Sequence, residues 1–466
     1  MPVIFTKRSV SLQARLNVSI TFGCDHFLYQ LKNPLNGMNI LMIFRNNPLE
    51  TSGAVTLDLF NDFKNKGHTV KLLVNKYDPS YPAGVISMET HYLFWKNKVI
   101  NKLQRMFRLI NKKPTDDKYH FHEVDEEKVF YSTNSILRTA GMKPDVIIIL
   151  FAKNFVNAKN IYELNVQTKA PVYWMMYDTS PLTGGCHYSW DCSGYQGTCG
   201  RCPGLFSSDP NDITHKNLVY KKKFLDKTDI SIVLASEWQS LQVARSTLFK
   251  DRTIHKILIA INPEVFKPVS KEVSHNKFSI PLEKKVIFFG AYNLDHERKG
   301  MHYLLEALLI LEKMLSNDPA LKSKIVLLIA GLEVDKIKNQ LPFPNIDLGM
   351  LDNNYGIASA YQAADIFACP SVEDAGPSMI NQSIMAGTPV VSFAQGVSLD
   401  IVTTGVTGYR AKLKDSHDLA RGMYSILSMN EAELAKMKKN CRDMAMDLFH
   451  PEVSTNKWLT ILNTSN

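Results

Sequence analysis

The sequence predicts an α/β protein made of two Rossmann-like domains, each with a parallel sheet covered by helices. Short apolar runs alternate with amphipathic helical segments in two successive series along the chain. A polar stretch with three prolines, residues 262–284, separates the two series. Two such domains facing across a cleft suit a two-substrate enzyme, because open parallel sheets bind ligands at the carboxyl ends of their strands.

The first series starts with a strand–loop–helix–strand unit typical of a parallel sheet. An apolar strand is expected at 39–44, and a polar loop follows it and ends in Ser52-Gly53. A helix is expected at 54–65, because its apolar residues recur at helical spacing, and Gly67 ends it. The later elements of this series are buried strands at 68–74, 144–151, 171–177 and 230–234, and a helix from Glu237 with Ser236 as its N-cap.

The second series repeats the alternation after the polar stretch. Its helices are recognised by leucines or small apolar residues at spacings of three and four, and its strands by short buried runs. The expected strands are 286–290, 325–330, 365–369 and 389–393, and the expected helices are 300–315, 358–363 and 377–385. No repeat of short period interrupts either series.

Composition narrows the class of protein. The chain has 466 residues, of which 45% are hydrophobic and 21% charged, so a disordered or fibrous protein is excluded. Lys and Arg outnumber Asp and Glu by 54 to 45, and the net charge of +9 suits an anionic partner. The longest aliphatic runs fall far short of the roughly 20 residues of a membrane span, and we expect no secretory signal. Seven cysteines, an odd number, indicate a reducing compartment, so a cytoplasmic location is expected.

An acidic loop between a strand and a helix is the most informative stretch of the sequence. Glu373 lies in this loop, Gly376 follows it, and the helix opens at Pro377 or Ser378. A helix N-terminus presents free N–H groups and the positive end of the helix dipole, so this place suits a phosphate. Glu373, expected as an exposed carboxylate, is suited to accept hydrogen bonds from sugar hydroxyls. Asn381, near the second helical turn, is placed to reach a ribose.

A second loop carries two adjacent cations. The strand ending at Gly290 is followed by a loop that holds Arg298 and Lys299, and Gly300 opens the next helix. Cations here would neutralise a departing nucleoside diphosphate as charge develops on it.

Together these stretches resemble the donor site of retaining GT-B glycosyltransferases, specifically glycosyltransferase family 4. The family pattern is a Glu, seven residues, a second Glu and then A-x-G-x-P-V-V, and this chain has Glu373 and the trailing MAGTPVV but Asn381 as the second member. Lys299 matches the diphosphate-binding Lys, whereas Ala291 stands in place of the family Arg, and Arg298 is expected to compensate. Gly53 resembles the family's Gly-rich loop, although any strand–helix turn needs small residues.

A third stretch resembles a subgroup of bacterial family 4 enzymes of capsule and O-antigen assembly. It reads T-G-G-C-H-Y at 183–188, followed by C-G-R-C-P at 199–203. Many of these enzymes have His-Asp where this chain has Tyr177-Asp178. Asp178 is therefore the candidate acceptor contact and His187 the nearest imidazole. The alternatives are that Asp178 caps the following turn and that His187 has a packing or supporting role.

Four cysteines lie in the same polar, Gly-rich loop. A C-x2-C pair is a usual knuckle for tetrahedral Zn²⁺, which thiolates prefer, and a structural zinc site is expected. Free thiols or a disulfide pair are the alternatives. The candidate ligands are Cys186, Cys192, Cys199 and Cys202.

A basic helix is expected at 92–113, where Lys and Arg lie between apolar residues at helical spacing. Such a helix suits an anionic membrane surface, and an ordinary amphipathic helix packed on its domain is the alternative. Nucleic-acid binding is not expected, because no aromatic platform or nucleic-acid motif accompanies the charge.

The resemblance covers roughly 38–460 and implies a hexosyltransferase that retains anomeric configuration. The donor would be a UDP- or GDP-sugar, and the acceptor a glycan or lipid-linked oligosaccharide of surface polysaccharide biosynthesis at the inner face of the membrane. The implied catalytic residues are Asp178, Lys299 and Glu373, with no catalytic metal. The alternatives are a non-catalytic nucleotide-sugar-binding scaffold subunit and a GT-B nucleotide-sugar epimerase. The expected parts are an N-terminal extension at 1–37, an acceptor domain at 38–265 with the Cys-rich loop at 183–204, a donor domain at 280–445, and a last helix at 446–466 that packs back on the acceptor domain.

Overall fold

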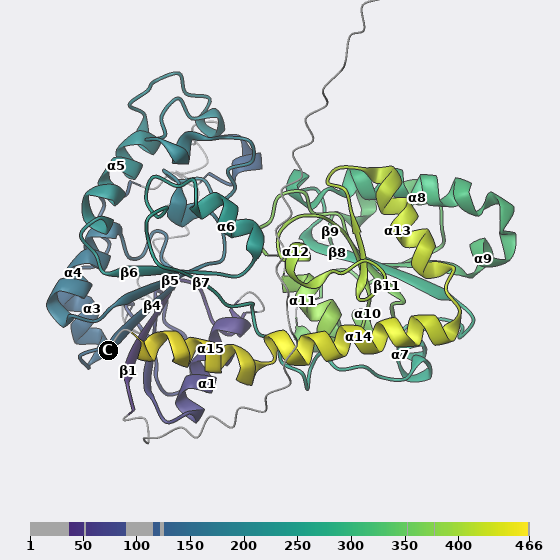
Figure 1. Cartoon of the computed structure of the whole chain (residues 1–466), viewed down its shortest axis with the longest axis horizontal. Coiled ribbons are helices and arrows are strands. Elements are labelled where there is room, and N and C mark those ends of the chain that lie inside the picture. The colour runs from purple at the N-terminus through teal and green to yellow at the C-terminus, as the bar shows by residue number, and fades with distance from the viewer. Residues whose placement is uncertain are drawn as a thin grey trace, which may run out of the picture. The chain divides into compact units, whose positions relative to one another are not determined.

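The first domain is built on a seven-stranded parallel sheet (Figure 1). The computed structural model describes residues 37–50, 53–89, 115–121, 125–351, 353–376 and 378–464. The strand order is β3-β2-β1-β4-β5-β6-β7, so the chain reverses its direction of winding between β1 and β4. The strands are β1 (Asn39–Phe44), β2 (Thr69–Val74), β3 (Val85–Ser87), β4 (Val146–Phe151), β5 (Val172–Met176), β6 (Ile230–Leu234) and β7 (Ile254–Lys256).

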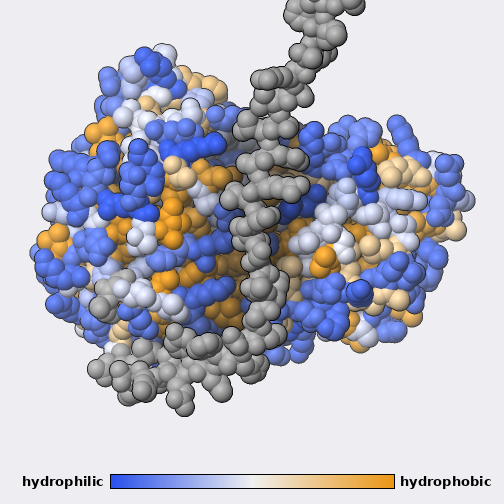
Figure 2. Space-filling view, viewed as in Figure 1, coloured by the Kyte–Doolittle hydropathy of each residue, from blue (hydrophilic) through white to orange (hydrophobic). Residues whose placement is uncertain are grey.

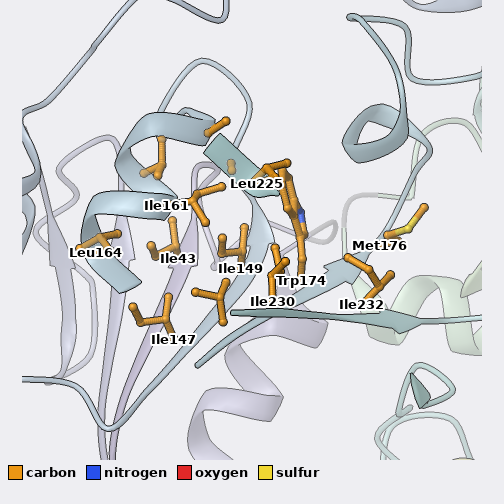
Figure 3. Packing of buried hydrophobic residues seen from close by; sticks show 14 of the residues in the cluster. Ile43, Ile147, Ile149, Ile161, Leu164, Trp174, Met176, Leu225, Ile230 and Ile232 are labelled. Atoms are coloured by element: carbon orange, nitrogen blue, oxygen red, sulfur yellow. The ribbon is translucent and has the colours of Figure 1, made fainter. Parts of the chain in front are cut away.

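Helices cover both faces of this sheet, because successive strand residues point to opposite sides. Ile147 and Ile149 pack with α4 on one face, whereas Ile148 packs with α1 and α15 on the other. Figure 3 shows Ile161 and Leu164 of α4 lying against the strand isoleucines. Each such buried side chain contributes about 1.5–3 kcal/mol relative to an exposed one. The helices of this domain are α1 (Ala54–Asn65), α3 (Thr133–Ala140), α4 (Ala158–Thr168), α5 (Ile213–Leu225) and α6 (Glu237–Val243).

The second domain repeats this plan with a six-stranded parallel sheet. Its order is β10-β9-β8-β11-β12-β13, and the winding reverses between β8 and β11. The strands are β8 (Lys285–Asn293), β9 (Ile325–Leu332), β10 (Asn345–Asp347), β11 (Ile366–Cys369), β12 (Val390–Phe393) and β13 (Gly408–Ala411). The helices are α7 (Lys271–Lys277), α8 (Met301–Met314), α9 (Pro319–Lys324), α10 (Asn354–Ala363), α11 (Ser378–Met385), α12 (Ser398–Ile401), α13 (Ser416–Leu427) and α14 (Glu431–Phe449).

The last helix, α15 (Pro451–Asn463), lies beside α1 of the first domain (Figure 1). Trp458 packs edge-on against Phe63 with 6.4 Å between ring centroids, and the Tyr173 hydroxyl donates to the carbonyl of Ile461 at 2.9 Å. Pro451 starts a new helix directly after α14, since proline is accepted at the first helical turn. The first and the last of the described elements, β1 and α15, therefore both belong to the first domain.

The two winding reversals place the ends of four strands where ligands bind in such folds. In open α/β sheets the crevice lies outside the carboxyl ends of the strands at this reversal. In the first sheet this is the end of β1 and β4, and in the second it is the end of β8 and β11.

Figure 2 shows that hydrophilic residues make up most of the visible surface, with apolar ones between them. Among the described helices, none is long and apolar enough to cross a bilayer.

Candidate active site

The two loops that follow β8 and β11 are held together at the winding reversal of the second sheet. The N–H of Val372 donates to the carbonyl of Arg298 at 2.9 Å. Gly300 has φ of +65°, and a Cβ there would lie 2.0 Å from the carbonyl oxygen of Pro370, so only glycine allows this approach. The sequence elements expected to form the donor site therefore meet.

A hollow of about 350 Å³ lies at this junction. Lys299 lines it, together with Met379 in the first turn of α11 and Ala291 at the end of β8. It is thus bordered by a cation and a helix N-terminus, the two features that stabilise a phosphate. Arg298 and Glu373 do not line this hollow.

Arg298 and Lys299 share one buried carboxylate that sequence reasoning missed. Arg298 Nη1 and Lys299 Nζ lie 2.6 and 2.7 Å from Asp374 Oδ2. Burial pushes the pKa of Asp374 upward, but Lys299 and Arg298 outweigh it, so the pKa lies below its usual value. Arg298 Nε is buried without a hydrogen-bond partner among the described residues. An incoming diphosphate would have to share these cations with Asp374.

Glu373 is buried, which corrects the expectation of an exposed loop carboxylate. Its side chain is only 7% exposed, and burial raises its pKa to about 7. One carboxylate oxygen accepts a hydrogen bond of 3.2 Å from the backbone N–H of Trp190 in the Cys-rich loop. The ionised form of Glu373 has two carboxylate oxygens that are able to accept hydrogen bonds from hydroxyl groups.

The remaining donor-side candidates do not all lie at the junction of the loops after β8 and β11. Asn381 is buried and donates from Nδ2 to the carbonyl of Ile259 at 3.2 Å. Ser378 opens α11, Gly376 lies in the loop before it, and Pro377 lies outside the described residues. Gly53 is the N-cap of α1 in the first domain, where a Cβ would lie 2.4 Å from the carbonyl oxygen of Asn47. Among the described residues, no hydrogen bond or ion pair joins Gly53 to the loops after β8 and β11.

On the acceptor side, the structure brings Asp178 and His187 into contact and adds Lys153. Asp178 Oδ2 lies 2.6 Å from His187 Nδ1, and His187 Nε2 lies 2.6 Å from Lys153 Nζ. Asp178 also accepts from the N–H of Ser180 at 2.8 Å, so it caps the turn as well. Burial favours the neutral acid, but His187 and Ser180 outweigh this and hold the pKa of Asp178 at about 2.

Lys153 follows β4 directly, at the winding reversal of the first sheet. Burial lowers the pKa of its ammonium group to about 7. Its only signal in the sequence is its place after the strand 144–151, because a lysine there carries no motif of its own. A hollow of about 680 Å³ opens at this point, lined by Lys153, Asp178 and Lys221 among others.

The Cys-rich loop spans the space between the acceptor-side and donor-side groups. The Tyr188 ring lies 4.5 Å from the guanidinium carbon of Arg298, a cation–π contact. The Trp190 indole N–H donates to the carbonyl of Lys118 at 2.9 Å, and Lys118 Nζ lies 4.4 Å from the Trp190 ring. The candidate groups of the two sheets therefore belong to one network.

The four cysteines of this loop line one hollow of about 330 Å³. All four have free thiols, and burial raises the pKa of Cys186 to about 12 and that of Cys199 to about 11. Within the described ranges, no three His, Cys, Asp or Glu side chains are arranged as a metal site. The four cysteines thus lie around one hollow, and the zinc site stays a prediction. The basic helix expected at 92–113 lies outside the described residues.

Fold and site define a two-domain α/β protein of the GT-B type, which confirms the predicted fold class. Residues 270–444 match the family model of glycosyl transferases group 1, and this match indicates a glycosyltransferase. Among curated protein sequences, none matches this chain.

Three solved structures illustrate the likeness in fold. Sucrose-phosphate synthase from Thermosynechococcus elongatus has a TM-score of 0.61 and 16% identity, over 92% of this chain and 98% of that one. Anabaena HepE in complex with UDP and glucose has a TM-score of 0.57 and 14% identity, over 91% and 99% of the chains. WaaG, a glycosyltransferase involved in lipopolysaccharide biosynthesis, has a TM-score of 0.55 and 13% identity, over 90% and 99%.

Proposed function

We propose that the chain transfers a hexose from a nucleotide sugar to a glycan or lipid-linked glycan, with retention of configuration, in surface polysaccharide biosynthesis. The observation that carries the proposal is the junction of the loops after β8 and β11. There Lys299 and the start of α11 line one hollow within the region that matches glycosyl transferases group 1. HepE binds UDP and UDP-glucose, which supports a uridine nucleotide as the donor.

In this proposal the second domain holds the donor. The diphosphate lies at the N-terminus of α11 beside Lys299, where the helix dipole and the cation stabilise the leaving group. Arg298 supplies further positive charge once the diphosphate competes with Asp374. Ionised Glu373 accepts hydrogen bonds from hydroxyls of the donor sugar. Positioning of this kind contributes several kcal/mol to catalysis without a metal ion.

The first domain holds the acceptor in the same scheme. Asp178 lies at the end of β5 and is bonded to His187, so it orients this imidazole toward Lys153. The hollow beside these groups gives the acceptor sugar a place at the carboxyl ends of β4 and β5. The basic segment 92–113 is proposed to bring the enzyme to an anionic membrane surface, where a lipid-linked acceptor is found.

A non-catalytic scaffold subunit is the second candidate, and two observations favour it. Asp374 already pairs with both Arg298 and Lys299 and offsets one of their two charges, and Asn381 donates to the Ile259 carbonyl. The epimerase has no comparable support among the described contacts.

Incubation with a panel of UDP- and GDP-sugars separates these functions when released nucleoside diphosphate is measured. The transferase releases it slowly even without acceptor, because water enters in place of the acceptor hydroxyl. A scaffold binds the nucleotide without turnover, and an epimerase converts the sugar while the nucleotide stays attached. Release abolished by Glu373→Gln would assign the turnover to this site, whereas unchanged release would remove the assignment.

A further inference from the structure

The hollow at the carboxyl ends of β4 and β5 is closed on one side by the turn that carries Lys153. This turn is tight, because the N–H groups of Phe155 and Val156 both donate to the carbonyl of Ala152. The hollow also has charged and amide groups from three other segments: Glu126 before α3, Asp178 after β5, and Asn217 and Lys221 on α5. It is therefore a formed site with converging polar groups rather than a gap between loops.

The hydrogen bonds around Lys153 determine which atoms donate. Asp178 is a carboxylate and only accepts, so His187 Nδ1 carries the hydrogen that it donates to Asp178. His187 Nε2 is then an acceptor, and the ammonium of Lys153 donates to it. Within the described residues, His187 is the one hydrogen-bonding group that Lys153 contacts. The other two N–H bonds of this ammonium have no acceptor within the described part of the chain, and Lys153 lines the hollow, so an oxygen ligand bound there would satisfy them.

The charges near Lys153 leave it short of negative partners. Asp178 stabilises its ammonium form, whereas Lys221 and Arg45 act against it. Lys221 is fixed in place by hydrogen bonds of 2.9 Å to the carbonyls of Ser180 and Thr183. Two further carboxyls, Asp125 and Glu126, and the cation Lys128 also line the hollow. Burial raises the pKa of Glu126, which accepts from the N–H of Ala158 at the start of α4. An added negative group would balance these charges in a low-dielectric place, where such interactions are strong.

We propose that this hollow binds an oxyanion of the acceptor, a carboxylate or a phosphate on its sugar, with Lys153 as the residue that contacts it. This inference rests on the proposed function, which identifies the ligand of the hollow as the acceptor, and it adds the chemical class of that acceptor. A charge-assisted hydrogen bond from an ammonium is shorter and about twice as strong as a neutral one. Lys153 thereby selects acidic over neutral acceptor sugars.

Direct binding of three glycosides tests the inference: methyl β-D-glucuronide, methyl β-D-glucoside 6-phosphate and methyl β-D-glucoside. Titration calorimetry of the full chain should show at least about tenfold tighter binding for an acidic glycoside than for the neutral one. Tight binding of only the glucuronide or only the phosphate assigns the oxyanion to a carboxylate or a phosphate. Equal binding of all three, or no binding of either acidic glycoside below about 10 mM, overturns the inference.

Variants locate the effect at Lys153. Lys153→Met should remove the preference for acidic glycosides, while Lys153→Arg should keep it, because the charge is retained. Lys159→Met is the matched control, since Lys159 lies on α4 with its Nζ 3.7 Å from Glu163 and does not line the hollow. A preference that survives in Lys153→Met overturns the inference. If Lys153→Met does not fold, the comparison of glycosides on the wild-type chain and on Lys153→Arg still decides.

UDP binding measured on the same samples separates this inference from the proposed function. If the chain binds UDP but shows no preference among the glycosides, the acidic acceptor is contradicted and the nucleotide-sugar function is not. A preference that depends on Lys153, without any binding of UDP or GDP, contradicts the nucleotide-sugar function and leaves the anion site standing.

Discussion

Arg298 Nη1 lies 2.6 Å from Asp374 Oδ2, and the same oxygen lies 2.7 Å from Lys299 Nζ. One buried carboxylate thus holds both cations that the sequence assigned to the donor diphosphate. The cations are positioned before any ligand arrives, and a diphosphate can bind them only in competition with Asp374. This relationship sets the expected results for changes at the donor side.

Asp374→Asn should bind UDP more tightly than the wild-type chain, because Arg298 and Lys299 lose their internal counter-charge. The same change should lower the free energy of unfolding by about 3–5 kcal/mol, since it leaves buried cations without a partner. Calorimetry with UDP and chemical denaturation measure the two effects. UDP affinity that falls in this variant would mean that Asp374 supports the nucleotide rather than competing with it.

Lys299→Ala should weaken binding of UDP and of the nucleotide sugar together, by about 1–3 kcal/mol for a charge-assisted contact. Arg298→Ala should act in the same direction if Arg298 replaces the arginine absent at Ala291. Lys313→Ala, in the last turn of α8, is the control and should bind UDP as the wild type does. If Arg298→Ala binds UDP normally, Arg298 pairs with Asp374 and does not contact the diphosphate.

Glu373→Gln should keep the fold and reduce transfer by about 10- to 1,000-fold, the usual cost of one lost orienting contact. Gln fills the same volume and still accepts from the Trp190 N–H, so circular dichroism should not change. Glu312→Gln on α8, which removes a partly buried carboxylate paired with Lys322, is the matched control. Equal turnover in Glu373→Gln and wild type would remove Glu373 from the donor site.

The rate should depend on pH through Glu373. Burial raises the pKa of this carboxyl to about 7, so it is protonated below this pH and ionised above it. Only the ionised form accepts hydrogen bonds with both oxygens, so kcat/KM for release of UDP in the absence of acceptor should rise with pH through about 7 and then level off. Acceptor is left out because Lys153, the proposed acceptor contact, also has a pKa of about 7. The pH profile of Glu373→Gln should lack this step. If kcat/KM of the wild type falls across the same pH range, the active form is the one in which Glu373 is protonated.

One Zn²⁺ per chain is expected in the Cys-rich loop, with the four sulfurs drawn to about 2.3 Å from the ion. The C-x2-C pair and the shared hollow support it, and binding would require the thiols to lose their protons. Elemental analysis of protein purified without chelator measures the content, and a value far below one means free thiols. Removal of the metal should lower transfer to acceptor more than UDP binding, and an equal loss of both would contradict this role.

The sequence allowed the fold class to be predicted because the central strands are buried on both faces. Val146–Phe151 and Val172–Met176 are continuous apolar runs, which parallel sheets require. The edge strands β3, β7, β10 and β13 were missed. The first three have only three residues each, none of them buried, and so carry no periodic signal. Helix α10 begins at Asn354, four residues before the expected start, where Asn353 caps it.

Site residues could be predicted from the sequence only where they lie in a recognisable motif. Glu373, Lys299 and Asp178 were named from loops that follow strands, but their partners lie far away in the sequence. Asp374 meets Lys299 across 75 residues, and Lys153 meets His187 across 34. Glu373 accepts from the N–H of Trp190, 183 residues earlier, and the burial that raises the pKa of Glu373 has no signal in the local sequence. Such pairings arise from the winding order of the sheets.

Proton NMR of a UDP-sugar during incubation with the chain tests the central claim most directly, because the anomeric signal reports both cleavage and stereochemistry. We predict that the donor signal declines while UDP appears, that the first free sugar has the anomeric configuration of the donor, and that Glu373→Gln slows the decline at least about tenfold. A panel of UDP- and GDP-sugars that bind but keep their anomeric signals unchanged would contradict the account and leave the scaffold function in its place.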